Sequence, residues 1–132
     1  MAKVRALGTT FSFGGTIIPN LTSIGEVSPT ADELDATTLD SASGYRDFLA
    51  GFKDSGEFTI TGYHDGSAAQ AGIRTAFGTG AAATTIITFQ TTPATTATFQ
   101  SFVKGYSIGS ADVDGVVGFG ATFRITGAVV VA

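Results

Sequence analysis

The segment 105–109 (Gly-Tyr-Ser-Ile-Gly) has the Gly-x-Ser-x-Gly spacing of hydrolase nucleophile elbows. In such an elbow the serine, here Ser107, lies on a strained turn between a strand and a helix, and the catalytic histidine follows later in the chain. In this sequence, residues 112–115 predict a hairpin turn into another strand, and the single histidine, His64, comes earlier. We therefore interpret the segment as part of a strand with a glycine at each end, and we predict that the protein is not an enzyme.

Three acidic groupings could act in acid–base chemistry or hold a cation. His64 and Asp65 are adjacent, but their place before a predicted turn favours a solvated histidine. Asp112 and Asp114 have the spacing of the first ligands of a calcium loop, whereas residues 116–118 (Val-Val-Gly) supply no further carboxylate. The densest acidic stretch lacks histidine and a fixed ligand spacing, which is typical of a solvated face. It comprises Asp32, Glu33, Asp35 and Asp40. We expect no bound metal.

Gly78 and Gly80 superficially resemble a dinucleotide-binding loop. In the dinucleotide fingerprint the glycines follow a strand and begin a helix, whereas here they follow the end of a predicted helix. We therefore expect no cofactor.

Composition favours a β-rich protein held together by packing. The 132 residues are 43% hydrophobic and 14% charged and include 18 glycines, so the chain can bury a core and is rich in turns. There is no cysteine, which excludes disulfides and thiolate sites. The net charge of −4 is opposite to the basic footprint of a nucleic-acid-binding protein. We expect one domain over residues 1–132, with no membrane span and no signal peptide, and assembly in the cytoplasm.

Hydrophobic alternation then predicts the elements that would position these residues. Alternating or β-compatible runs are separated by Gly, Pro, Asn and Asp turns, and they predict strands at 9–14, 21–27, 34–39, 58–63, 84–91, 97–108 and 117–126. Ser67 and Gln70 have capping-box spacing, and Gly78 follows the last apolar residue, so we predict one helix at 67–77. The predicted fold is mainly β: a β-sandwich or half-barrel of about seven to eight strands with one flanking α-helix.

The stretch 40–56 does not resemble a strand, because it contains three glycines and several charges. We predict a long loop, in which Tyr45, Phe48, Leu49 and Phe52 fall at i, i+3, i+4 and i+7 and would share one side of a short amphipathic turn. This apolar side could fold back over the edge of the sandwich. Alternatively, association between copies of the chain would cover both the loop and the exposed strand edges.

Two segments carry a resemblance to a known family. Residues 31–41 (ADELDATTLDS) and 45–58 (YRDFLAGFKDSGEF) resemble the loop region of the major tail tube proteins of long, non-contractile tailed phages. The order of the following strand, helix and terminal pair of strands is also similar, so the resemblance extends over nearly the whole chain. It implies a structural virion protein whose hexameric rings stack into a hollow tail tube, assembled in the host cytoplasm and conducting DNA from capsid to host.

The resemblance also implies contacts and partners. The long loop would connect neighbouring rings through Leu39, Tyr45, Arg46, Asp47, Phe48, Leu49 and Phe52. Further copies of the chain, a tape-measure protein, and tail tip and terminator proteins would be partners, while DNA passes a like-charged wall without specific binding. Alternation does not reveal which residues face the lumen. Two other functions remain open: an inner-tube subunit of a contractile tail or secretion system, and a monomeric β-sandwich decoration or binding module.

Overall fold

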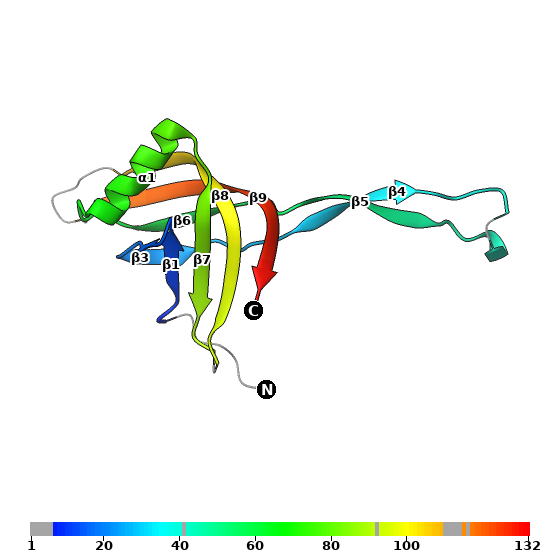
Figure 1. The fold of residues 1–132 in the computed structure, drawn as a ribbon, viewed down its shortest axis with the longest axis horizontal. Coiled ribbons are helices and arrows are strands. Elements are labelled where there is room, and N and C mark those ends of the chain that lie inside the picture. Colours follow the sequence, from blue (N-terminus) through cyan, green and yellow to red (C-terminus); the bar gives the residue numbers. More distant parts are fainter. Residues whose placement is uncertain (1–6, 41, 92, 110–114, 116) are drawn as a thin grey trace.

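One curled, seven-stranded antiparallel sheet makes up the body of the protein (Figure 1). The computed structural model describes residues 7–40, 42–91, 93–109, 115 and 117–132. The strand order in this sheet is β2-β1-β7-β8-β9-β6-β3. Its strands are β1 (Thr10–Phe13), β2 (Thr16–Ile17), β3 (Leu21–Ile24), β6 (Glu57–Tyr63), β7 (Ala83–Phe89), β8 (Thr95–Ile108) and β9 (Gly118–Val131). The predicted half-barrel with one helix is confirmed.

The sheet folds over on itself because β8 and β9 are long and bent. Each has 14 residues, and their pairing shifts register between Thr98 and Gln100 and again between Val103 and Gly105. Such irregularities let a strand pass from one layer of a sandwich to the other. We call β2, β1, β7, residues 95–101 of β8 and the end of β9 the β7 half. The β6 half consists of β3, β6, the start of β9 and residues 102–108 of β8. In Figure 1 the strands of one half run across those of the other.

A phenylalanine cluster fills the space between the two halves. Phe58 stacks on Phe123 with ring centroids 5.3 Å apart, and Phe11 lies 5.4 Å from Phe123. The alternation predicted for the last strand is confirmed, because its apolar residues are buried: Phe119, Ala121, Phe123 and Ile125. This burial fixes which face of the β6 half is the core face.

The helix α1 (Ala68–Thr79) lies across one end of the sandwich (Figure 1). It begins as predicted, with the Ser67 hydroxyl accepting a hydrogen bond from the Gln70 backbone N–H. It ends two residues later than predicted, because Gly80, and not Gly78, takes the left-handed conformation and donates its N–H to the Ala76 carbonyl. Ile73 is fully buried against the core, so α1 closes this end of the sandwich.

The stretch 40–56 is not the predicted loop. Residues Phe48–Asp54 form strand β5, which pairs antiparallel with β4 (Thr30–Asp35) in a separate two-stranded sheet. A short 3-10 turn, Ala42–Gly44, lies near the tip. The predicted helical turn is wrong, because pairing across the hairpin satisfies the backbone polar groups that a helical turn would have bonded internally. No helix in the described part of the chain is both long and apolar enough to cross a membrane.

Candidate assembly surfaces

The hairpin β4–β5 projects from the body as an arm, which we define as residues 30–54 (Figure 1). Every residue of β4 is exposed, and only Gly51 of β5 is partly covered. Large apolar side chains are nevertheless frequent on the arm, and Phe52 is 90% exposed. The others are Leu34, Leu39, Tyr45, Phe48 and Leu49. An isolated two-stranded hairpin is marginally stable in water, and exposed apolar side chains in this number are typical of interaction surfaces.

The apolar residues of the arm lie on both of its faces. Leu34 is directly opposite Leu49, whereas Phe48 is opposite Asp35, and neighbouring residues of a strand point to opposite faces. Near Gly51 the register shifts by one residue, and a Cβ on this glycine would lie 3.2 Å from Leu34 Cγ. The sequence prediction that Tyr45, Phe48, Leu49 and Phe52 share one side is therefore wrong for Phe48 and Leu49.

Polar groups hold the tip of the arm together. The Arg46 guanidinium donates to the Asp35 carboxylate at 3.0 Å, and the Ala36 N–H donates to the Asp47 carbonyl at 2.8 Å. Hydrogen bonds from Thr37, and secondarily the Arg46 guanidinium, lower the pKa of the Asp35 carboxyl. Arg46 and Asp47, predicted as contacts with other subunits, thus both take part in interactions within the arm. The exposed ion pair itself adds little stability.

Two strand edges of the β6 half are open in the described structure. Within this half the strands follow the order β3-β6-β9-β8, and each neighbouring pair is antiparallel. β7 pairs with β8 only as far as Ser101, so residues 102–108 of β8 have β9 as their strand partner on one side alone. β3 at the other side pairs only with β6. Unpaired edges are templates for further strand pairing.

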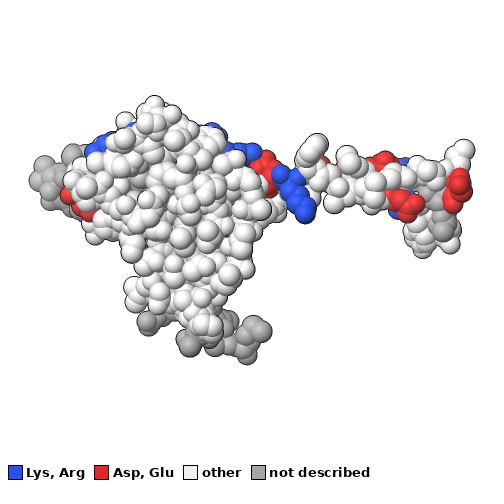
Figure 2. Space-filling view, in the orientation of Figure 1, with Lys and Arg blue, Asp and Glu red and all other residues white. Residues whose placement is uncertain are grey.

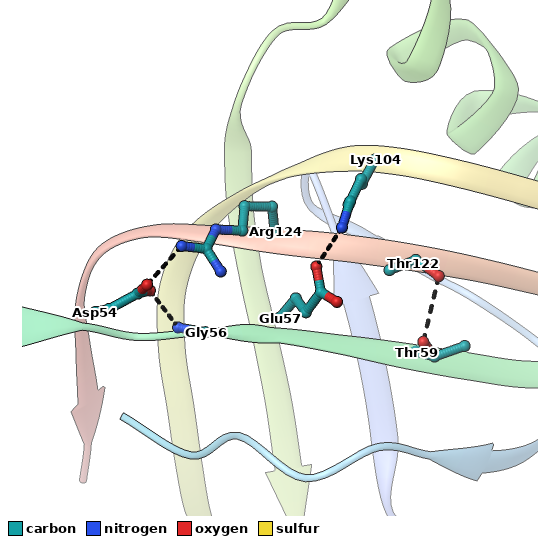
Figure 3. Close-up of polar contacts among 7 residues, drawn as sticks. All are labelled: Asp54, Gly56, Glu57, Thr59, Lys104, Thr122 and Arg124. Carbon is teal, nitrogen blue, oxygen red and sulfur yellow. Dashed lines mark hydrogen bonds and ion pairs between the residues drawn. The ribbon is translucent and has the colours of Figure 1, made fainter. Parts of the chain in front are cut away.

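The solvent-facing side of the β6 half carries polar side chains that form ion pairs and hydrogen bonds with one another (Figure 3). The Lys104 ammonium donates to the Glu57 carboxylate at 2.7 Å, and the Arg124 guanidinium donates to the Asp54 carboxylate, also at 2.7 Å. The pKa of the Glu57 carboxyl is lowered by Lys104, and that of Asp54 by the Gly56 backbone N–H first and by Arg124 second. Each of these cations is therefore matched by a carboxylate.

Charge is unevenly distributed over the surface. In the view of Figure 2, the body between α1 and the end of the β7 half is almost free of charged residues, whereas the arm carries both signs. In the same view, basic side chains lie along the upper margin of the body, acidic ones appear at its left end, and both signs meet at the base of the arm.

The candidate catalytic residues that the structure describes, Ser107 and His64, lie in or next to ordinary strand pairings. Ser107 lies inside the regular strand β8, not on a strand-to-helix turn, and the Gly109 N–H donates to the Gly118 carbonyl as the pairing continues. The His64 backbone N–H donates to the Val117 carbonyl beyond the end of β6. Asp112 and Asp114 lie outside the described residues. Within the described ranges, no three or more His, Cys, Asp or Glu residues gather in a way that could hold a metal ion.

An open apolar cavity of about 670 Å³ lies at the end of the sandwich away from α1. Sequence reasoning missed it, because it forms only where the ends of β7, β8 and β9 diverge from β3. Its apolar lining comes from β3 and the segment after it on one side and from β7, β8 and β9 on the other: Leu21, Ile24, Val27, Ile87, Phe89, Ala97, Val129 and Val131.

Neither a protein-family model nor a curated protein matches the sequence. Solved structures match over nearly the full length at low identity. The tail of an empty gene transfer agent particle, with C6 symmetry, has a TM-score of 0.72 and 15% identity and covers 100% of this chain and 99% of its own. The tail tube of SPP1 has a TM-score of 0.69 and 14% identity, covering 98% and 78%.

A third likeness comes from a contractile machine. The sheath/tube terminator structure of an extracellular contractile injection system has a TM-score of 0.77 and 12% identity, covering 100% of this chain and 98% of its own. The chain therefore has a tail tube fold, one shared by phage-like tails and contractile injection systems. The fold expected from the sequence resemblance is confirmed.

Proposed function

We propose that the protein is a structural subunit that assembles into stacked hexameric rings, forming the hollow tail tube of a phage or phage-like particle, and that it catalyses no reaction. The observation that carries this proposal is the pair of open edges on the β6 half. β3 and β8 run in opposite directions, because three antiparallel pairings separate them. Copies related by rotation about an axis along the strands would therefore join β3 to β8 in an antiparallel ladder, and the ring would leave no lateral edge.

The size of such a ring suits a conduit. Each subunit contributes the four strands β3, β6, β9 and β8, so six subunits give a barrel of 24 strands. Barrel diameter grows with strand number, and barrels of about 16–18 strands already enclose a water-filled channel. Six-fold symmetry is that of the matched gene transfer agent tail.

The arm would connect one ring to the next. Figure 1 shows β5 and β6 running in line, so an arm directed along the tube axis places the strands of the β6 half along that axis as well. Because Leu49 and Phe48 lie on opposite faces of the arm, the subunits that cover the arm would have to contact both faces. We propose that the arm lies between two subunits of the neighbouring ring, with Leu39, Tyr45, Phe48, Leu49 and Phe52 as anchors. Contact between unlike surfaces propagates a filament.

In this arrangement the polar side of the β6 half would line the lumen. Glu57 and Asp54 hold Lys104 and Arg124 in ion pairs, so the cations on this side are already matched. With a net charge of −4 per chain, the wall would repel phosphates and let DNA pass without binding. The protein would then reside in the virion tail after assembly in the host cytoplasm. Its partners would be further copies, a tape-measure protein, and tail tip and terminator proteins.

The second candidate is the inner tube of a contractile tail or injection system. The observation favouring it is the likeness to the contractile injection system structure, whose TM-score of 0.77 exceeds the 0.69 of the SPP1 tube. An inner tube is enclosed by a sheath, so co-purification of a sheath protein with the assembled chain would support this candidate.

Sedimentation velocity and negative-stain microscopy at rising protein concentration test the proposal. We expect monomers at low concentration and rings or tubes of uniform diameter above a threshold. A chain that stays monomeric at every concentration, including when tail tip proteins are added, would contradict the proposed function and favour a monomeric binding module.

A further inference from the structure

The two ends of the sandwich are closed differently. At one end α1 covers the gap between the two halves, and its Ile73 fills the core. At the other end no helix of the described chain covers the gap, and the cavity of about 670 Å³ opens there. Its lining includes the buried residues Ile87 and Ala97, while Val131 at the end of β9 is 66% exposed. The cavity therefore connects the apolar core to solvent.

The outer surface of the closed end carries an aromatic pair. Phe77 of α1 is 46% exposed, Tyr106 of β8 is 42% exposed, and their rings meet edge to face with centroids 5.3 Å apart. Both residues lie beside the open edge formed by residues 102–108 of β8. Exposed aromatic side chains of this kind are typical anchors of protein interfaces.

The pairing of edges brings these two features together. Leu21 and Ile24 of β3 form one wall of the cavity, so the cavity lies directly beside the open edge of β3. Tyr106 lies on the open edge of β8, which in the proposed ring would pair with β3 of the adjacent copy. A ladder between β3 of one copy and β8 of the next therefore places the second copy's α1 against the first copy's cavity.

We propose that the open cavity of each subunit is closed by the adjacent subunit of the same ring, which inserts its Phe77–Tyr106 pair into it. The inference rests on the proposed function, because it needs the ring. The two contacting surfaces are both mainly apolar, since Glu26 is the only charged residue among the described residues that line the cavity. Each subunit would thus supply a helix to cap its neighbour, and the hydrophobic core would continue around the ring.

Cysteine cross-linking tests this contact directly, because the chain has no cysteine of its own. Phe77→Cys is combined with Val131→Cys, and assembled protein is treated with a short bismaleimide and run on a denaturing gel. The matched control combines Phe77→Cys with Val130→Cys. Val130 is 60% exposed and adjacent to Val131, but it points to the opposite face of β9 and does not line the cavity. We expect a ladder of products up to six subunits for Val131→Cys and at least a tenfold lower yield for Val130→Cys.

A second measurement uses Phe77→Ser, with Thr75→Ser on the same helix as control. Removing one exposed aromatic anchor should raise the concentration needed for assembly at least about tenfold while thermal unfolding of the monomer changes little. Tubes that form normally with Phe77→Ser, or equal cross-linking at positions 130 and 131, would overturn the inference and leave the proposed function standing. A wild-type chain that forms no rings at all would overturn both.

Discussion

Replacing two arm phenylalanines by serine should abolish assembly and leave the fold intact. In the double variant Phe48→Ser, Phe52→Ser, both changes fall on the arm, away from the packed core. Phe52 is 90% exposed and Phe48 is 50% exposed in the single chain. Surface substitutions of this kind usually change the free energy of unfolding by less than about 0.5 kcal/mol. Folding should therefore be nearly unaffected.

The effect on assembly should be much larger. Burying a fully exposed phenylalanine side chain contributes about 1.5–3 kcal/mol. The exposed fractions of Phe48 and Phe52 amount together to somewhat more than one whole side chain, so covering both contributes about 2–4 kcal/mol per arm. This corresponds to a loss of about 30- to 1000-fold in the association constant for each contact.

The assay compares urea unfolding of the monomer with the concentration at which tubes pellet. We expect an unchanged unfolding midpoint and no tubes at concentrations where the wild type is fully assembled. Phe123→Ala is the contrasting control, because truncating this buried core side chain should lower the free energy of unfolding by about 3–5 kcal/mol. If the double variant assembles at the wild-type concentration, the arm does not connect the rings.

Three further predictions concern the wall, the arm and the β3 edge. Asp54→Asn combined with Glu57→Gln should free Arg124 and Lys104, so assembled tubes should retain labelled DNA fragments at low salt but not at high salt. The control, Asp32→Asn combined with Glu33→Gln, removes the same charge from the arm and should not cause DNA retention. Equal retention by the two variants would contradict the assignment of the lumen. The pKa values of the Asp35 and Asp54 carboxyls are lowered in the folded chain, so their stabilising effect is present above the ordinary aspartate pKa and is lost as the pH falls through the lowered values. Hydrogen exchange should show the arm amides losing protection only in this acidic range, and loss between pH 7 and 5 would refute the assignment. Gly62→Ala should destabilise the protein to urea by about 1–3 kcal/mol, because a Cβ at this position would clash with the Asn20 carbonyl oxygen and displace β3. Gly72→Ala, where a Cβ would meet nothing within 4 Å, should not destabilise it, and equal unfolding midpoints for the two variants would contradict the close packing of β3 on β6.

Local patterns predicted those elements whose sequence periodicity matches their burial. β9 alternates because one of its faces packs on the phenylalanine core, and the caps of α1 are set by Ser67 and a nearby glycine. The bends of β8 and β9 could not be predicted, because they arise from register shifts in pairings between strands that are separated by the 109–117 connection. A register shift of this kind is a mismatch between two paired strands, so the alternation of one strand alone does not locate it.

The arm shows why the candidate site was only partly predictable. Its apolar residues were found from composition, but a helical period was assigned to residues that form a strand. Spacings of three, four and seven match a helix face, and Gly51 and the charged neighbours argued against a strand in a single-sequence analysis. Strand β5 exists because β4 lies beside it, and that pairing is not local information. The cavity was missed for the same reason, since four strands and the segment after β3 build it.

A helical reconstruction of tubes grown from the purified chain tests the central claim most directly. We predict six subunits per ring, β3 of each subunit paired antiparallel with residues 102–108 of β8 in the next, and the arm of one ring lying against the ring beside it. Tubes in which β3 stays unpaired and the β6 half faces outward, or a chain that forms no tubes, would contradict the account.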